Sequence, residues 1–199
     1  VDEQINNIKQ TIGLLNQTKE GLAQDLFKYG FENHQEYKET KIGPITHKCP
    51  SIWNEVTLSE ISEKITEIGH NMPDKTEDGI PFITAGDVTG EWPPDFDSVE
   101  RIPEKEYNRL KDGFNAEIWD IVYSRFGSGS IGIARKVDFE QPFIASYSVA
   151  LIKPKDGINV DYLLSLMNYE KYRQAANQLA VGAANTNLNL HEIRDMKLI

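Results

Sequence analysis

The chain has 199 residues, of which 39% are hydrophobic and 26% charged, a composition typical of a soluble globular protein that can bury its own core. Its net charge of −10 argues against nucleic-acid binding, because most nucleic-acid-binding domains are basic. The charge is uneven, however: residues 53–112 carry −9 and residues 113–199 are neutral, so an anion-binding surface is expected in the last segment.

The single cysteine, Cys49, excludes a disulfide within the chain and favours a reducing compartment. No apolar run approaches the roughly 20 residues that cross a bilayer, and the N-terminus lacks a signal-peptide pattern. We therefore expect a cytoplasmic protein without a membrane partner. The missing initiator Met suggests a fragment of a longer protein.

Residues 3–29 predict a long helix, and Gly30 is a suitable residue to end it. Its apolar residues recur in steps of three and four, with one seven-residue step where Lys19 fills the missing position. This is the heptad seam of a coiled coil, and Tyr29 closes it. An amphipathic helix lying on its own domain remains the alternative. The seam consists of Ile5, Ile8, Ile12, Leu15, Lys19, Leu22 and Leu26.

The next segment, residues 32–52, is polar and aperiodic and predicts an extended linker. Residues 57–69 predict a short helix that begins with a Thr57–Glu60 capping pair. A strand is expected from residue 80, leading into a turn at Gly86 and Asp87, and helical turns are expected at 103–110.

Alternating hydrophobic residues predict strands at 116–126, 130–137, 142–154 and 196–199. Helices are expected at 159–180, capped by Asn159 or Asp161, and at 190–196, capped by Asn189. Strands in the middle with helices before and after indicate an α+β fold with a largely antiparallel sheet. The expected domains are a helix at 1–31, a linker at 32–52 and a mixed α/β domain at 53–199.

Gly127, Gly129 and Gly132 form the pattern G-x-G-x-x-G, which in dinucleotide-binding folds follows a strand, begins a helix and precedes an acidic residue about 20 positions on. Here a strand-like run follows the glycines, and the region about 20 residues on has no acid. The glycines therefore predict a tight connection between strands, or a close approach of the backbone to another group.

No catalytic signature is apparent. The only Pro-Pro, in "EWPPDF", lacks the polar and aromatic neighbours of an adenine methyltransferase motif. The four histidines lack metal-ligand spacing, and the serines lie in no nucleophile-elbow context. We therefore expect no cofactor, no metal and no catalysis.

Four motifs occur in a characteristic order: "IPFITAGDV", "DIVYSRFGSGSIGIARKV", "ALIKPKDGINVDYLLSLMN" and "LNLHEIRDMKLI". Their order resembles the target recognition domain of type I restriction–modification specificity subunits. The helix "INNIKQTIGLLNQTKEGLAQDLFKYGF" resembles the conserved spacer helix of that family, so the resemblance covers nearly the whole chain.

The resemblance implies sequence-specific recognition of one half of a bipartite DNA target, without catalysis. The partners it implies are double-stranded DNA, methyltransferase subunits docked through the helix and, indirectly, the restriction subunit. The family's distal partner helix is absent from this sequence, so we also expect a homodimer through the seam. A protein-interaction module that uses only its coiled coil and a DNA methyltransferase remnant remain as alternatives.

Side chains suited to bases or phosphates gather in two loops, and a third, weaker candidate is the turn that contains Thr84 and Asp87. Arg125 pairing with an acid, the asparagines capping the helix at 190–196, and Ser128 and Ser130 as plain turn residues remain open alternatives. The loop candidates are Tyr123, Ser124, Arg125, Ser128, Ser130, Arg135, Lys136, Asn185, Thr186, Asn187 and Asn189.

Overall fold

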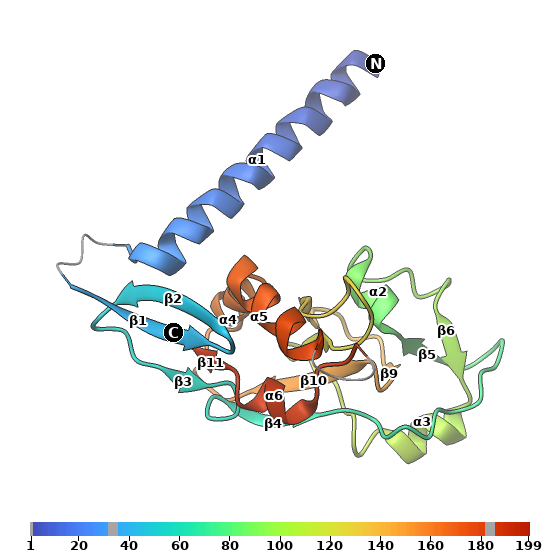
Figure 1. Cartoon of the computed structure of the whole chain (residues 1–199). Coiled ribbons are helices and arrows are strands. Elements are labelled where there is room, and N and C mark those ends of the chain that lie inside the picture. The colour runs from blue at the N-terminus through green and yellow to red at the C-terminus, as the bar shows by residue number, and fades with distance from the viewer. Residues whose placement is uncertain (1, 32–35, 182–185) are drawn as a thin grey trace. The chain divides into compact units, whose positions relative to one another are not determined.

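The computed structural model describes residues 2–31, 36–181 and 186–199 (Figure 1). The chain forms two compact units. The first contains residues 1–40 and 46–54, and the second contains residues 41–45 and 55–199. No helix in the described part of the chain is long and apolar enough to cross a membrane.

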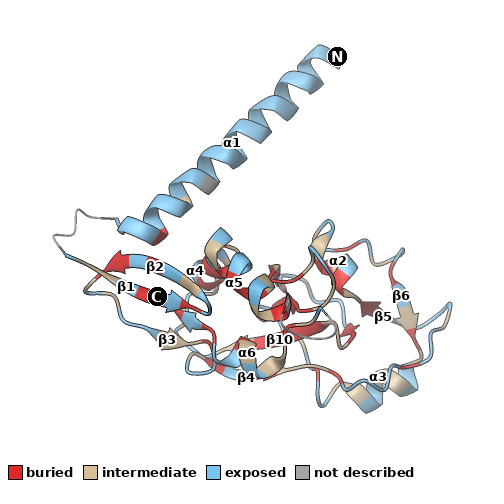
Figure 2. Ribbon diagram, viewed as in Figure 1, coloured by how far each residue is buried: buried red, intermediate tan, exposed pale blue. Residues whose placement is uncertain are grey.

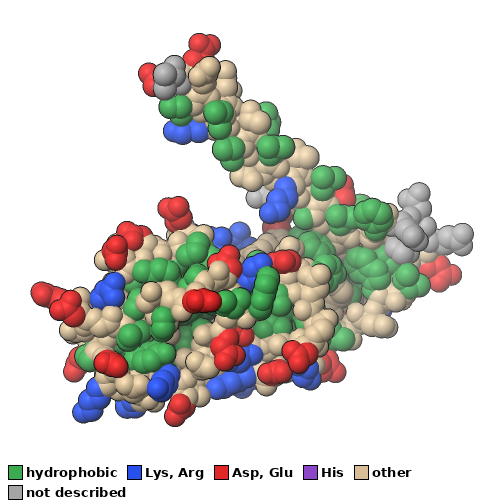
Figure 3. All heavy atoms as spheres, turned by 180° about the vertical axis from the view of Figure 1, so that it is seen from behind, with side chains coloured by type: hydrophobic (Ala, Val, Ile, Leu, Met, Phe, Trp, Pro, Cys, Tyr) green, Lys and Arg blue, Asp and Glu red, His purple; other side chains and the backbone are tan. Residues whose placement is uncertain are grey.

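The first unit begins with α1, Asp2–Tyr29, which confirms the long helix. Gly30 ends it with a φ of +77°, and its N–H donates to the Leu26 carbonyl over 2.9 Å. Nearly the whole helix is exposed (Figure 2), and several hydrophobic side chains lie along the face of it that Figure 3 shows.

The residues expected to be an extended linker instead contain a β-hairpin. It consists of β1, Tyr37–Ile42, and β2, Ile45–Pro50, joined by a turn in which Gly43 has a φ of +53°. Its buried positions alternate along each strand and include Thr40, His47 and Cys49. Because two of these three are polar, the two-residue period is invisible to a search for alternating large hydrophobic residues.

The second unit contains a four-stranded antiparallel sheet in the order β4–β10–β7–β8. The two central strands, β10 and β7, are buried, as Figure 2 shows for β10. The four strands are β4 (Ser62–Thr66), β10 (Val149–Pro154), β7 (Ile121–Ser124) and β8 (Ala134–Lys136).

Two smaller sheets complete the strands. In one, β5 pairs antiparallel with β6 and parallel with β9; in the other, β3 pairs antiparallel with β11. The expected α+β fold with a largely antiparallel sheet is therefore confirmed. The strands are β3 (Val56–Thr57), β5 (Ile80–Ile83), β6 (Glu100–Ile102), β9 (Ile144–Ala145) and β11 (Lys197–Leu198).

Five helices accompany these sheets in the described part of the second unit. The helix expected at 159–180 is interrupted at residues 168–169 and becomes α4 and α5, and Asn159 caps α4 by accepting from the Tyr162 N–H. The helices are α2 (Ala85–Thr89), α3 (Glu104–Leu110), α4 (Val160–Met167), α5 (Glu170–Val181) and α6 (Leu190–Arg194).

The prediction of a helix at 57–69 is wrong, because this segment forms strands β3 and β4 with a turn between them. The Thr57–Glu60 capping pair is nevertheless formed: the Thr57 N–H donates to Glu60 Oε2 over 2.6 Å, and the Glu60 N–H donates to Thr57 Oγ1 over 3.3 Å. The same pair of bonds that begins a helix here closes a turn.

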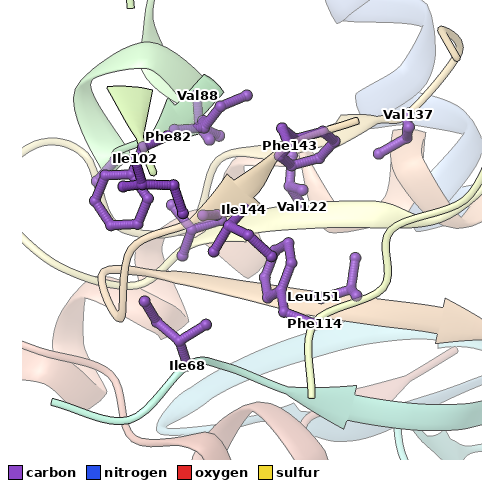
Figure 4. Packing of buried hydrophobic residues seen from close by; sticks show 14 residues of the cluster. Ile68, Phe82, Val88, Ile102, Phe114, Val122, Val137, Phe143, Ile144 and Leu151 are labelled. Carbon is purple, nitrogen blue, oxygen red and sulfur yellow. The ribbon is translucent and has the colours of Figure 1, made fainter. Parts of the chain in front are cut away.

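The main hydrophobic core fills the space between the four-stranded sheet and the β5 region (Figure 4). Val122 and Leu151 come from the central strands, Phe82 and Ile144 from the smaller sheet, and all four are fully buried. This core fixes the end of β7, where the candidate site begins.

Candidate nucleic-acid interface

The glycine-rich segment connects β7 to β8, as its sequence predicts. Gly127, Gly129 and Gly132 have φ values of +94°, +81° and +90°, which side chains other than glycine rarely adopt. The strand ladder extends into this connection, since the Ser124 N–H donates to Ile133 O and the Gly132 N–H to Ser124 O, each over 2.9 Å. A strand follows the glycines, so the segment lacks the helix of a dinucleotide-binding loop.

At Gly132 the backbone of the connection lies close to helix α5, the kind of close approach that the glycines predict. A Cβ atom at this position would lie 3.2 Å from Arg173 Cα on α5. The carbonyl of the preceding residue, Ile131, accepts from the Asn177 side chain over 3.1 Å. The connection is therefore held against α5.

The second candidate segment, residues 186–189, lies directly against the first. Phe126 and Asn187 form a β-bridge. The Gly127 N–H donates to Thr186 O over 3.1 Å, and the Leu188 N–H donates to Arg125 O over 2.8 Å. The two loops that the sequence offers as separate candidates thus form one surface. Asn185 lies outside the described residues.

Arg125 occupies the centre of this junction and is only 3% exposed. Its guanidinium forms an ion pair with Glu67 and donates to Tyr147 O over 2.6 Å, to Leu188 O over 2.8 Å and to Asn187 Oδ1 over 3.0 Å. The alternative in which Arg125 pairs with an acid is therefore correct, and direct contact between this side chain and DNA does not fit its burial.

Burial also changes the electrostatics of this ion pair. Desolvation raises the pKa of Glu67 above its ordinary value, although Arg125 opposes the shift. Desolvation likewise lowers the pKa of Arg125. The His70 ring centre is 5.0 Å from that of Tyr147, and interaction with His70 also lowers the pKa of Glu67.

Tyr123 and Ser124 are also buried, with no exposed surface, which does not fit their expected role as DNA contacts. They belong to the central strand β7, all four residues of which are buried, so both faces of the strand are covered and neither side chain reaches the surface. Burial raises the pKa of the Tyr123 hydroxyl. The sequence pattern did not show that β7 is a central strand, because its alternation resembles that of a half-exposed strand.

The two cations on β8 are already engaged. Arg135 Nε donates to Val88 O over 3.0 Å and Arg135 Nη2 to Gly90 O over 2.9 Å, which attaches α2 to the sheet. Lys136 Nζ lies 2.5 Å from Asp161 Oδ1. Arg173 on α5, next to Gly132, is an exposed cation that the sequence reasoning missed.

Thr84 and Asp87 form a capping box that begins α2. The Asp87 carboxylate accepts from the Thr84 N–H and Oγ1, each over 2.7 Å. This short helix replaces the expected turn. It is tied to the main junction by Ser148, whose Oγ accepts from the Ala85 N–H over 3.1 Å and whose carbonyl accepts from the Arg125 N–H over 3.0 Å.

Asn189 caps α6 through Glu192, whose carboxylate accepts from the Asn189 N–H over 2.7 Å. The capping alternative therefore holds for this asparagine. The groups that remain at the surface are Ser128 and Thr186, which are exposed, and Ser130 and Asn187, which are half-buried. We call these four residues the polar rim.

Sequence reasoning missed the segment of Tyr147 and Ser148, which supplies acceptors for Arg125 and for α2. Phe126 packs edge-on against Tyr147, with ring centres 5.6 Å apart. No local motif marks these residues, because their role depends on backbone carbonyls. No group of three or more potential metal ligands occurs among the described residues.

No model of a known protein family matches the sequence. Two curated relatives from Methanocaldococcus jannaschii do. The type I restriction enzyme MjaVIII specificity subunit is 26% identical over 190 residues, which cover 91% of this chain and 42% of that protein. The putative type I restriction enzyme MjaX specificity subunit is 28% identical over 174 residues, covering 81% of this chain and 39% of that protein.

The fold is similar to solved specificity subunits. The S subunit of a type I restriction–modification system from M. genitalium matches 98% of this chain and 45% of its own, with a TM-score of 0.61 at 16% identity. The HsdS subunit from Thermoanaerobacter tengcongensis matches 98% of this chain and 42% of its own, with a TM-score of 0.55 at 13% identity. This chain thus spans less than half the length of each. In sequence and in fold, the chain resembles the specificity subunits of type I restriction–modification systems.

Proposed function

We propose that this chain recognises DNA sequence within a type I restriction–modification complex and catalyses no reaction itself. The observation that carries the proposal is the joining of the two predicted loops into one surface, by the Phe126–Asn187 bridge and the hydrogen bonds beside it. The names of the curated relatives, which are specificity subunits, support it.

The polar rim suits base or phosphate contact. Its hydroxyl and amide groups both donate and accept hydrogen bonds, as base edges in the major groove require. The Gly127 and Gly132 N–H groups donate within the chain, so among the three glycines a phosphate contact would fall to the N–H of the exposed Gly129. Arg125 lies beneath this surface and acts as a positioning residue: one guanidinium holds residues 147, 187 and 188 at fixed places.

The proposal extends to one half of a bipartite target and to docking of methyltransferase subunits on α1, with the restriction subunit as an indirect partner. The exposed apolar seam of α1 supports the docking role, because Ile8, Leu15 and Leu22 are each at least 60% exposed. In the absence of that partner, the same seam supports a homodimer.

The alternative is an interaction module that acts only through α1 and never contacts DNA. The two functions differ in what substitution of the polar rim changes. In a complete complex that contains this chain, Ser128→Ala combined with Thr186→Ala is expected to change the methylated sequence or to lower methylation at the original site at least roughly tenfold, given about 1–3 kcal/mol per lost base contact.

The matched control is Ser165→Ala, which removes an exposed hydroxyl from α4 in the same unit. Sequencing of methylated DNA checks the outcome. Unchanged methylation and unchanged target sequence in the double variant would reject the rim as the reading surface and favour the α1-only module. A methyltransferase remnant would instead bind S-adenosylmethionine, and calorimetry is expected to show no such binding.

A further inference from the structure

A groove of about 520 Å³ lies in the second unit, apart from the polar rim. Its walls are the turn 117–120, the segment 153–161 and Glu63 on β4. The turn 117–120 precedes β7, whereas the glycine connection follows β7. The groove therefore lies at the opposite end of this strand from the proposed DNA surface.

Two large hydrophobic side chains lie at the edge of the groove. Ile118 is 42% exposed and Trp119 is 55% exposed. They occupy the middle of a tight turn, in which the Asp120 N–H donates to Glu117 O over 3.0 Å. Two adjacent exposed hydrophobic residues at a concave surface are typical of a protein-interaction site.

Trp119 is the one non-glycine residue with a positive φ, +80°, in the described part of the chain. This φ fits the third residue of a type II turn, a position that glycine normally occupies. Lys136 Nζ lies 4.7 Å from the centre of the indole ring and 2.5 Å from Asp161 Oδ1. The ammonium group thus lies over the ring, and Trp119 nevertheless remains 55% exposed.

The charge of the groove is negative. Of its two lysines, Lys153 lies 2.8 Å from both Glu117 and Asp120, and Lys155 donates to Glu60 O over 2.7 Å.

The carboxylates of Glu63 and Asp156 are exposed and form no ion pair within the described residues. DNA phosphates would be repelled here, whereas a cation would be attracted.

We propose that this groove docks a segment of a partner protein in which Lys or Arg residues flank an aliphatic or aromatic side chain. The apolar side chain packs against Trp119 and Ile118, and the flanking cations lie near Glu63 and Asp156. This charge complementarity commits the groove to a basic protein segment. The proposal does not depend on DNA recognition, because it involves the other end of β7.

The test is an NMR titration of the ¹⁵N-labelled 199-residue chain. The probe is the capped peptide Lys-Leu-Phe-Lys-Leu, and the matched control is Glu-Leu-Phe-Glu-Leu. We expect saturable shifts of the Trp119 indole N–H and of the amides at 117–120 and 156–157 with the basic peptide, and none with the acidic peptide.

Two variants sharpen the test. Trp119→Gly suits the positive φ, so the folded spectrum and thermal stability are expected to persist while the peptide-induced shifts disappear.

Glu63→Gln with Asp156→Asn is expected to weaken binding roughly tenfold at low salt, because each exposed ion pair contributes a few-fold. Asp74→Asn, an exposed acid elsewhere in the same unit, is the control and should have no effect.

Three patterns of shifts would overturn the proposal, as would the absence of any saturable shift with the basic peptide. The three patterns are equal shifts with the acidic peptide, shifts that persist in Trp119→Gly, and the same shifts with N-acetyl-lysine methylamide alone, which would indicate a site for small organic cations. Because none of these measurements involves DNA, failure here leaves the proposed DNA recognition unaffected.

Discussion

At the scale of single residues, Arg125 shows what sequence can and cannot predict about the site. Its position beside the glycine turn is evident from the sequence, but its burial is not. The acceptors that enclose it come from residues 67, 147, 187 and 188, which are distant in the chain. Only the folded chain brings them together, so an arginine expected to contact DNA is found to support the surface from below.

Arg125→Ala is expected to destabilise the fold by about 3–5 kcal/mol, because it leaves the half-buried Glu67 carboxylate without its partner. Arg125→Lys retains the charge but loses the planar fork, and an intermediate loss is expected. Urea unfolding measures both. Arg109→Ala is the control, since it breaks an exposed pair with Glu106 and should cost less than about 1 kcal/mol. Equal effects of the two alanine variants would contradict the positioning role.

The same ion pair predicts a dependence of stability on pH. The pKa of Glu67 is raised above 4.5 in the folded chain, so the folded state binds more protons than the unfolded state just above that pH. The free energy of unfolding of the native chain, measured relative to Glu67→Gln, is therefore expected to fall as pH rises from about 4.5 through the raised pKa. Urea unfolding of both proteins across this range checks the sign, and a rising difference would mean that attraction by Arg125 outweighs desolvation.

Two glycines of the connection allow close approach and backbone conformation to be separated. Gly132→Ala is expected to destabilise by about 2–4 kcal/mol, because its φ is +90° and the new Cβ would lie 3.2 Å from Arg173 Cα. Gly129→Ala has a similar φ, +81°, but no atom within 4 Å, so about 1 kcal/mol is expected. Thermal unfolding compares them, and equal losses would show that the approach to α5 is not restrictive.

At the scale of elements, the exposed face of α1 offers a matched pair of leucines. Leu15 lies on the heptad seam and is 63% exposed, whereas Leu14 lies off it and is 64% exposed. Leu15→Glu is expected to weaken self-association of the chain at least roughly tenfold, since it buries a charge in a helix–helix contact. Leu14→Glu should leave it unchanged. Sedimentation measures both, and a native chain that stays monomeric at high concentration would contradict the seam.

The elements also show where sequence patterns suffice. Strong periodicity with clear end signals predicted α1, α6 and β5 correctly, and Asn159 and Asn189 cap helices as expected, but α4 and α5 were predicted as one uninterrupted helix. Residues 57–69 were predicted wrongly because a Thr-x-x-Glu pair closes a turn as well as it begins a helix. The β1–β2 hairpin was missed because polar residues such as Thr40 and His47 occupy buried positions. Tertiary packing, which no local pattern records, decides such segments.

At the scale of the whole molecule, the charge distribution limits what the chain can do alone. Its net charge is −10, and two of the cations near the candidate surface, Arg125 and Arg135, are held by protein acceptors. Few cations therefore remain to neutralise DNA phosphates. The proposed sequence recognition therefore relies on hydrogen bonds from the small polar rim, and we expect other parts of a complete complex to supply the attraction for phosphates.

This limit predicts a weak salt dependence. For the isolated chain, the logarithm of DNA affinity plotted against the logarithm of salt concentration is expected to have a slope of roughly −1 to −3, since each neutralised phosphate contributes about −0.9. Fluorescence anisotropy with a labelled duplex measures this slope. Arg173→Gln removes an exposed cation beside Gly132 and should bring the slope closer to zero by about one, while Lys105→Gln on α3 should leave it unchanged. A slope near −8 would require a basic surface that the described residues lack, and would place the DNA elsewhere on the chain.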